Sequence, residues 1–220
     1  MKKLSFAEEN YLKAVYHLSN AGELDVTTNS IAEEMDTKAA SVSDMLRRLS
    51  EKEMVVYKKY QGVKISEKGK TAALQVIRKH RLWEVFLVEK LKFNWDQVHE
   101  IAEQLEHIKS PLLIQRLDDF LGHPKFDPHG DPIPDENGLF KEKPQVPLAE
   151  VEVSGDGIVV AVKDTNSMFL QHLDRIGIYL GAKTKVTEKV EFDGSMEILI
   201  DGKNKLFISK EVAENVLVTH

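Results

Sequence analysis

Apolar residues recur with helical spacing through the first half of the chain. In six segments between residues 6 and 121 they return every three or four positions, which is the spacing of one face of a helix. The second segment begins at Ser30, which forms a capping-box pattern with Glu33 three positions later. The pattern predicts helices over residues 6–18, 31–35, 39–55, 68–91, 95–108 and 111–121.

Two other parts of the chain alternate with the period of a β-strand. Residues 54–66 contain two β-rich runs around Gln61-Gly62, which predicts a hairpin with a two-residue turn. After about residue 148, short alternating runs are separated by Asp-Gly pairs at 193–194 and 201–202. This second region is expected to form a small β-barrel or sandwich.

The composition narrows the possible chemistry. The 220-residue chain has no cysteine, so disulfides, thiolate zinc sites and iron–sulfur clusters are excluded, and any metal must be held by nitrogen and oxygen ligands. No apolar stretch is long enough to span a bilayer, and acidic residues follow the N-terminal lysines before an apolar signal segment can develop. We therefore expect a cytoplasmic protein with no membrane partner.

Basic residues gather in one window of an acidic chain. The net charge is −6, but residues 38–70 hold nine Lys/Arg against four Asp/Glu, a balance of +5 that leaves −11 for the rest of the chain. A confined basic region on an acidic protein is typical of a nucleic-acid-binding face.

The predicted third helix and the basic hairpin both lie in this window. The apolar face of that helix consists of Val42, Met45, Leu46 and Leu49. A generic three-helix bundle with a hairpin fits the same pattern, but arginines on the free face and lysines on the hairpin favour a winged helix-turn-helix that binds DNA. The DNA-contacting residues that we expect are Lys38, Ala40, Ser41, Ser43, Asp44, Arg47, Arg48, Lys58, Lys59 and Lys64.

A second polar pattern lies on the predicted helix 95–108. At 100° per residue, an arc of about 100° on one face carries His99, Glu103, Glu106 and His107. A solvated polar face is the simpler interpretation. No lysine or arginine of this helix shares the arc, however, so the glutamates would repel each other unless a divalent cation lies between them. His80 and Glu84, four positions apart on the preceding helix, offer a further pair of ligand atoms.

Several segments together resemble a known family. They are ENYLKAVYHL, ASVSDMLRRLSEKEMVVYKKYQGVKISEKGK, RKHRLWE, VHEIAEQLEH and HGDPIP. The chain resembles, over essentially its whole length, the diphtheria-toxin-repressor and manganese-transport-regulator family of metal-dependent repressors of metal-homeostasis genes. The resemblance implies a mainly α fold with a small β part. Its domains would be a winged helix-turn-helix (1–72), a helical dimerisation and metal-binding domain (73–140) and an SH3-like, FeoA-type β-barrel (141–220).

The resemblance also implies two metal sites per subunit. The ligands carried over for one site are His80, Glu84 and His99, and those for the other are Asn10, Glu103, Glu106 and His107. Iron-type members have Met at the first and Cys at the second of positions 10 and 103, and manganese-type members have carboxylates at both. Because this chain has no sulfur ligand there, Mn²⁺ is the expected metal and Fe²⁺ the alternative.

Three other positions depart from the family pattern. Lys13 stands where manganese-type members without a C-terminal domain carry a further glutamate. The positions that match the C-terminal ligands of iron-type relatives are Val160 and Lys163, which cannot bind a metal. We therefore assign no ligand to the C-terminal domain.

The expected partners are palindromic double-stranded operator DNA and a second copy of the chain, with no small organic substrate. A metal that joins the first helix to the dimerisation helix would fix the DNA-binding third helices of the two subunits at a spacing of about one DNA turn. A homodimer is also favoured because one helical layer cannot bury all the apolar residues between 68 and 121, which include Trp83, Val85, Phe86, Leu112 and Leu113. Two alternatives stay open: a metal-independent winged-helix regulator and a di-metal carboxylate enzyme.

Overall fold

The computed structural model describes residues 4–58, 62–140 and 144–219. The chain divides into two compact units. The first comprises Met1–His80, Glu103–Arg116 and Pro134–Phe140, and the second comprises Arg81–Ala102, Leu117–Ile133 and Lys141–His220. In the described part of the chain, no helix combines the length and apolarity needed to cross a membrane.

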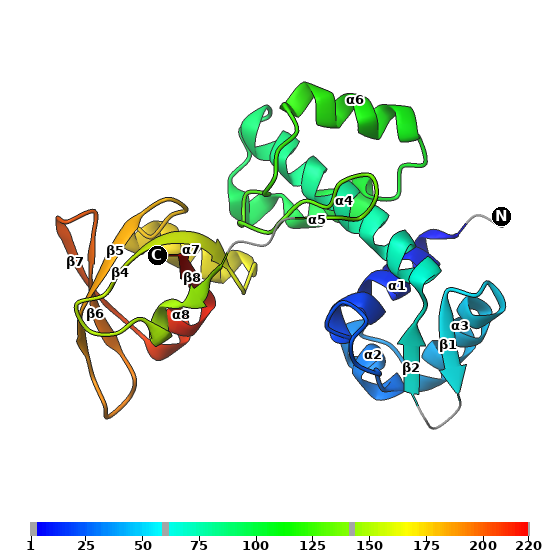
Figure 1. Ribbon diagram of the computed structural model, residues 1–220, viewed down its shortest axis with the longest axis horizontal. Helices are drawn as coiled ribbons and strands as arrows, with labels where there is room; N and C mark the ends of the chain where they lie inside the picture. Colours follow the sequence, from blue (N-terminus) through cyan, green and yellow to red (C-terminus); the bar gives the residue numbers. More distant parts are fainter. Residues whose placement is uncertain (1–3, 59–61, 141–143, 220) are drawn as a thin grey trace. The chain divides into compact units, whose positions relative to one another are not determined.

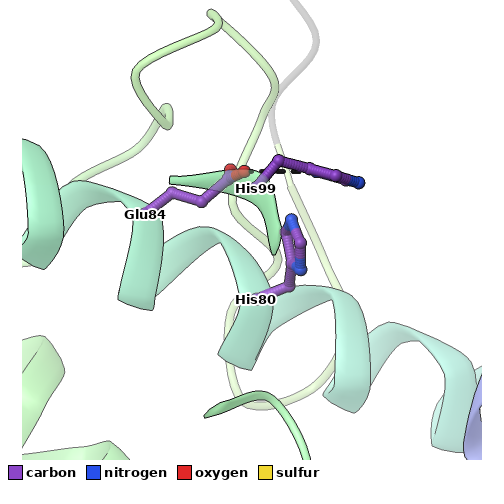
Figure 2. Close-up of side chains that lie close together, drawn as sticks. All are labelled: His80, Glu84 and His99. Carbon is purple, nitrogen blue, oxygen red and sulfur yellow. Dashed lines mark ion pairs between the residues drawn. The ribbon is translucent and has the colours of Figure 1, made fainter. Parts of the chain in front are cut away.

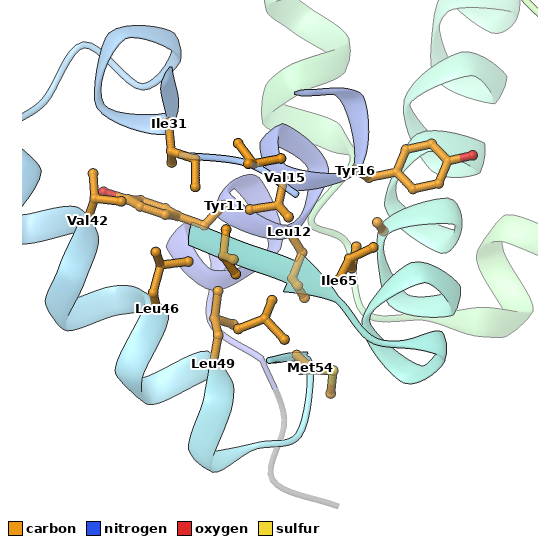
Figure 3. Packing of buried hydrophobic residues seen from close by; sticks show 14 of the residues in the cluster. Tyr11, Leu12, Val15, Tyr16, Ile31, Val42, Leu46, Leu49, Met54 and Ile65 are labelled. Atoms are coloured by element: carbon orange, nitrogen blue, oxygen red, sulfur yellow. The ribbon is translucent and has the colours of Figure 1, made fainter. Parts of the chain in front are cut away.

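The first unit begins with three helices and a hairpin (Figure 1). These elements are α1 (Phe6–Leu18), α2 (Thr28–Glu34), α3 (Ala39–Glu51), β1 (Val55–Lys58) and β2 (Gly62–Ile65). Side chains from α1, α2, α3 and β2 point into one core, as Figure 3 shows. Leu12, Ile31, Leu46 and Leu49 are fully buried in this core. Such burial contributes about 1.5–3 kcal/mol for each large side chain, so the core holds the apolar face of α3 against α1.

Three local predictions in this unit were wrong. Helix α2 begins earlier than expected because Thr27, not Ser30, is its N-cap and accepts a hydrogen bond from the backbone N–H of Ser30. Helix α3 ends at Glu51, since Glu53 adopts a positive φ of 62° and the chain turns into β1. Gly62, which was expected in a two-residue turn, instead pairs with Lys58 inside the hairpin ladder, and Gln61 lies outside the described residues.

Four further helical segments occupy the middle of the chain. They are α4 (Glu67–Glu89), the 3₁₀ turn η1 (Trp95–Gln97), α5 (His99–Leu105) and α6 (Pro111–Leu121). The single helix predicted over residues 95–108 is therefore wrong at both ends. Asn94 caps the separate turn η1, and α5 stops before Glu106, where a bond from the Ile108 N–H to the Leu105 carbonyl closes a tight turn.

The C-terminal part of the second unit is an antiparallel sheet with two helices. The strand order is β3-β8-β4-β5-β6-β7. The strands are β3 (Val146–Pro147), β4 (Asp156–Val162), β5 (Lys183–Lys189), β6 (Met196–Ile200), β7 (Asn204–Ile208) and β8 (Val216–Thr219). They are joined by η2 (Leu148–Glu150), α7 (Ser167–Ile176) and α8 (Lys210–Asn215). The predicted small β domain is confirmed, but its described strands leave the sheet open between β3 and β7 and do not close a barrel.

Candidate functional site

Helix α3 has one buried face and one polar, exposed face. Val42, Leu46 and Leu49 are buried, whereas Met45 is only half-buried. Most of the expected DNA-contacting residues are exposed, namely Lys38, Ala40, Ser41, Asp44, Arg47, Arg48, Lys58 and Lys64. Ser43 is half-buried, and Lys59 lies outside the described residues. The exposed residues form a basic surface on α3 and the hairpin.

The first predicted set of ligands comes together around α4. His80, Glu84 and His99 offer ligand atoms that all lie within 4.8 Å of one another, and we refer to them as the Glu84 group. His80 and Glu84 project from successive turns on the same side of α4, and His99 reaches them from the start of α5 (Figure 2). The Nδ1 atom of His99 lies 3.6 Å from Glu84 Oε1. Glu84 is buried, so its charge needs a cationic partner.

A second set meets where α1, α4 and α5 pack in the first unit. His80, Glu103 and Glu106 also offer ligand atoms within 4.8 Å of one another, and we call them the Glu106 group. Glu106 is fully buried, and its Oε2 accepts a hydrogen bond of 2.7 Å from His80 Nδ1. Burial acts to raise the pKa of Glu106, but the His80 hydrogen bond and the Lys13 charge outweigh it and hold the pKa below its usual value. Glu106 is therefore ionised, as a metal ligand must be.

Lys13 of α1 pairs with the same carboxylates. Its Nζ donates to Glu103 Oε1 at 2.6 Å and to the two oxygens of Glu106 at 2.8 and 2.9 Å. The expectation that these glutamates lack a compensating charge is therefore wrong. A lysine distant in the sequence supplies the charge that their own helix does not.

His107 lies beside the Glu106 group, and Asn10 lies on α1, the helix that also carries Lys13. His107 Nε2 is 3.7 Å from Glu106 Oε1, while its Nδ1 bonds to Glu9 Oε2 at 2.6 Å. The Oδ1 atom of Asn10 is buried and has no hydrogen-bond partner in the described structure. An unsatisfied buried oxygen costs about 1–3 kcal/mol, and a bound cation would satisfy it. The donor set of carboxylate, amide and imidazole atoms thus fits a hard divalent metal.

Sequence reasoning missed a third group in the loop that follows α6. Glu84, Asp127 and His129 are all buried and offer ligand atoms within 4.8 Å of one another. Burial acts to lower the pKa of His129, but Glu84 and Asp127 outweigh it and raise the pKa to about 9. Burial, with Asp131 and Glu84 nearby, raises the pKa of Asp127 to about 7. The only signal in the sequence was the HGDPIP segment, since a loop has no periodicity from which its side-chain directions follow.

The C-terminal domain donates no side chain to these groups among the described residues. The Nε2 atom of Gln171 on α7 instead donates to Asp96 Oδ2 at 2.7 Å, and Asp164 Oδ1 accepts from the Asn166 N–H at 2.8 Å. Neither residue is part of the three groups of candidate ligands.

Comparisons with known proteins agree on one class for the whole chain. The family profile described as the iron-dependent repressor N-terminal DNA-binding domain matches residues 3–63. The profile for the metal-binding and dimerisation domain of the same repressors matches residues 66–135, and the FeoA domain profile matches residues 146–220. The class defined by the three matches together is a metal-dependent transcriptional repressor.

Individual relatives cover nearly the full length. The iron-dependent repressor IdeR of Mycobacterium tuberculosis (strain ATCC 25618 / H37Rv) is 29% identical over 99% of each chain. The diphtheria toxin repressor of Corynebacterium diphtheriae is 29% identical over 93% of each chain. A solved manganese-dependent transcriptional repressor in complex with manganese is 33% identical, covers 96% of this chain and 98% of its own, and superposes with a TM-score of 0.86. The crystal structure of ScaR with bound Zn²⁺ is 32% identical over the same shares, with a TM-score of 0.77.

The chain belongs to the iron-dependent repressor family, whose members include the diphtheria toxin repressor. This membership confirms the resemblance noted in the sequence, including the FeoA-type C-terminal domain. It also decides between the alternatives left open, because the family consists of metal-dependent repressors rather than enzymes or metal-independent regulators.

Proposed function

We propose that this protein represses metal-homeostasis genes by binding palindromic operator DNA as a homodimer when it is loaded with Mn²⁺ or, alternatively, Fe²⁺. The observation that carries this proposal is the meeting of α1 with the Glu106 group. Asn10 and Lys13 belong to α1, which shares a core with the α3 surface, while Glu103 and Glu106 belong to the metal-binding segment. A cation at this place would join the two.

Two metal sites per subunit are proposed. Support for the first comes from the compact Glu84 group, namely His80, Glu84 and His99. The second would use Asn10, Glu103, Glu106 and His107. A bound cation would supply the charge that draws these oxygen and nitrogen donors together. Mn²⁺ depends most on hard oxygen donors among the divalent first-row metals, and this chain offers no sulfur ligand other than methionine.

His80 links the two proposed sites. It lies one turn before Glu84 on α4 as a ligand of the first site, and its Nδ1 also bonds to Glu106 of the second. Asp127 and His129 are candidates for extending the first site, because they share Glu84 with it. Loading of one site would therefore change the charge that the other experiences.

The DNA interface is proposed on α3 and the hairpin. In this proposal, residues 1–72 form a winged helix-turn-helix domain. Support comes from the exposed Arg47 and Arg48 on the face of α3 opposite its buried side chains. In this arrangement α3 enters the major groove, and Lys58 and Lys64 of the hairpin contact phosphate. Lys59 keeps its predicted role as a third phosphate contact.

A homodimer through the domain proposed for residues 73–140 is supported by exposed apolar side chains on α6. Leu112 and Phe120 are 60% and 65% exposed, which is unfavourable for an isolated chain and typical of an interface. Val85, which was expected to contribute to this surface, is instead buried within the chain itself. The remaining residues, 141–220, are proposed as a separate FeoA-type domain. A repressor of this kind acts where the DNA lies, so we propose a cytoplasmic location.

The test is an electrophoretic mobility shift with DNA selected from a random duplex pool by the Mn²⁺-loaded protein. The expected result is a palindromic consensus and a shift that chelator abolishes and added Mn²⁺ or Fe²⁺ restores. Equal binding with chelator and with metal would refute metal-dependent repression. A consensus without two-fold symmetry would refute operator binding by a homodimer.

A further inference from the structure

The ammonium group of Lys13 lies inside the shell of oxygens proposed as the second metal site. Its Nζ contacts Glu103 Oε1 and both Glu106 oxygens at 2.6, 2.8 and 2.9 Å. These are short, charge-assisted hydrogen bonds. The Lys13 side chain is only 15% exposed and that of Glu106 is fully buried, so solvent screens the contact weakly.

Lys13 therefore has the position and the charge of a bound cation. Two carboxylates that share a buried space repel each other when both are ionised, and a positive charge between them removes the repulsion. The ammonium does this from α1, and it holds α1 against the Glu103–Glu106 pair without a metal.

We propose that Lys13 is a tethered competitor of the metal: it neutralises Glu103 and Glu106 in the metal-free protein and must withdraw before a divalent cation binds there. The inference rests on the second metal site of the proposed function. A metal on the same oxygens would lie within a few ångströms of the ammonium, and at that distance two cations in a weakly screened space repel strongly. Withdrawal is feasible because the lysine has a flexible stem and a head that water solvates well.

The competitor sets the concentration at which the second site fills. Metal affinity is reduced by the free energy needed to move Lys13 from its two carboxylates into water. The second site of this chain is therefore tuned to a higher free Mn²⁺ concentration than the same ligands would require without the lysine. Lys13 is in this sense a residue that determines affinity, although it binds no metal.

The experiment compares Lys13→Met with its parent in a His99→Gln background, which removes an imidazole ligand of the first site and leaves the Glu106 group intact. Methionine has nearly the length of the lysine side chain and no charge, and its soft thioether is a poor ligand for Mn²⁺. Calorimetric titration with Mn²⁺ on chelator-stripped protein is expected to show affinity at least about tenfold higher in Lys13→Met, as removal of a nearby like charge demands. The melting temperature without metal is expected to fall, because the glutamates lose their partner.

Lys52→Met is the matched control. Lys52 makes the same kind of contact, with both oxygens of Glu8 at 2.6 and 2.8 Å, but touches no proposed ligand. This variant is expected to lose stability while its Mn²⁺ affinity stays within about twofold of the parent, a change of less than half a kcal/mol. A similar gain of affinity in both variants would overturn the inference, since it would reflect general loosening.

A second measurement follows Lys13 directly in the unaltered chain. Withdrawal into solvent predicts that an amine-acylating reagent modifies Lys13 faster at saturating Mn²⁺ than with chelator, as read by mass spectrometry of its peptide. Equal or slower modification at saturation would overturn the inference.

The outcomes separate this inference from the proposed function. Mn²⁺ binding that Glu106→Gln abolishes, with equal affinity in the parent and in Lys13→Met, would overturn the role of Lys13 alone. Absence of Mn²⁺ binding in both would contradict the second metal site, and with it the inference.

Discussion

Glu106→Gln isolates the charge at the centre of the proposed second site. Glutamine has nearly the shape of glutamate, so the fully buried position keeps its volume. The change removes the negative charge that His80 and Lys13 both contact, at 2.7 and 2.8 Å. The packing of the surrounding helices should therefore persist while the electrostatics change.

Two magnitudes follow from these contacts. Replacement of a partner that only orients a ligand costs about 10–100-fold in metal affinity, so loss of a direct charged ligand should cost at least about 100-fold, or ~2.7 kcal/mol. Each hydrogen bond to a charged group contributes about 1.5–3 kcal/mol to stability, and the amide oxygen can still accept one of them. The metal-free variant should thus lose about 1–3 kcal/mol of unfolding free energy and still fold.

Calorimetry with Mn²⁺ and urea unfolding in chelator measure the two effects separately. Glu100→Gln is the matched control, because Glu100 is an exposed carboxylate on α5, the helix that ends just before Glu106, and belongs to none of the three groups. Unchanged Mn²⁺ affinity in Glu106→Gln, with Glu100→Gln also unchanged, would refute the assignment of Glu106 as a ligand.

Three other predictions concern the DNA surface, the choice of metal and the loop after α6. Lys64→Ala should weaken binding to all duplexes alike and reduce the slope of log K against log salt by about one, whereas a change of sequence preference would contradict a phosphate contact. Asn10→Met with Glu103→Cys should move half-activation of DNA binding away from Mn²⁺ toward Fe²⁺; an unchanged ratio of the two metals under anaerobic titration would show that these positions do not select the metal. Gly130→Ala should lower the unfolding free energy by about 1–3 kcal/mol or more, because a Cβ there would lie 2.0 Å from the Val160 carbonyl oxygen and φ is +92°, and an unaltered urea midpoint would contradict this packing.

The sequence predicted most of the helices because their signal is local. One apolar face on each of α1, α3 and α4 repeats over several turns, and each such face is buried in the structure. The predicted polar face of a helix over residues 95–108 correctly placed Glu103 near Glu106, but the two residues do not lie on one helix as that prediction assumed. Glu103 lies on α5, whereas Glu106 follows its end and turns inward, and the partners that stabilise it there are 93 and 26 residues away.

The residues that the sequence did not reveal are those that depend on tertiary contacts. In the sequence, Lys13 looks like any exposed lysine on the polar face of an amphipathic helix. Only the packing of α1 brings it into ion pairs with Glu103 and Glu106. Asp127 and His129 lie in a loop whose path depends on contacts such as the bond from the Val162 N–H to the His129 carbonyl. No periodic pattern encodes such contacts, so local reasoning could not find them.

The central claim is that metal and operator DNA stabilise the same conformation. Binding free energies are reciprocal, so if Mn²⁺ strengthens operator binding, the operator must strengthen Mn²⁺ binding by the same factor. The most direct measurement is a calorimetric Mn²⁺ titration of the protein alone and of the protein saturated with its selected operator duplex. We predict affinity about 5–150-fold higher in the presence of the operator, the range typical of coupled sites. Equal Mn²⁺ affinity with and without the duplex would contradict the account.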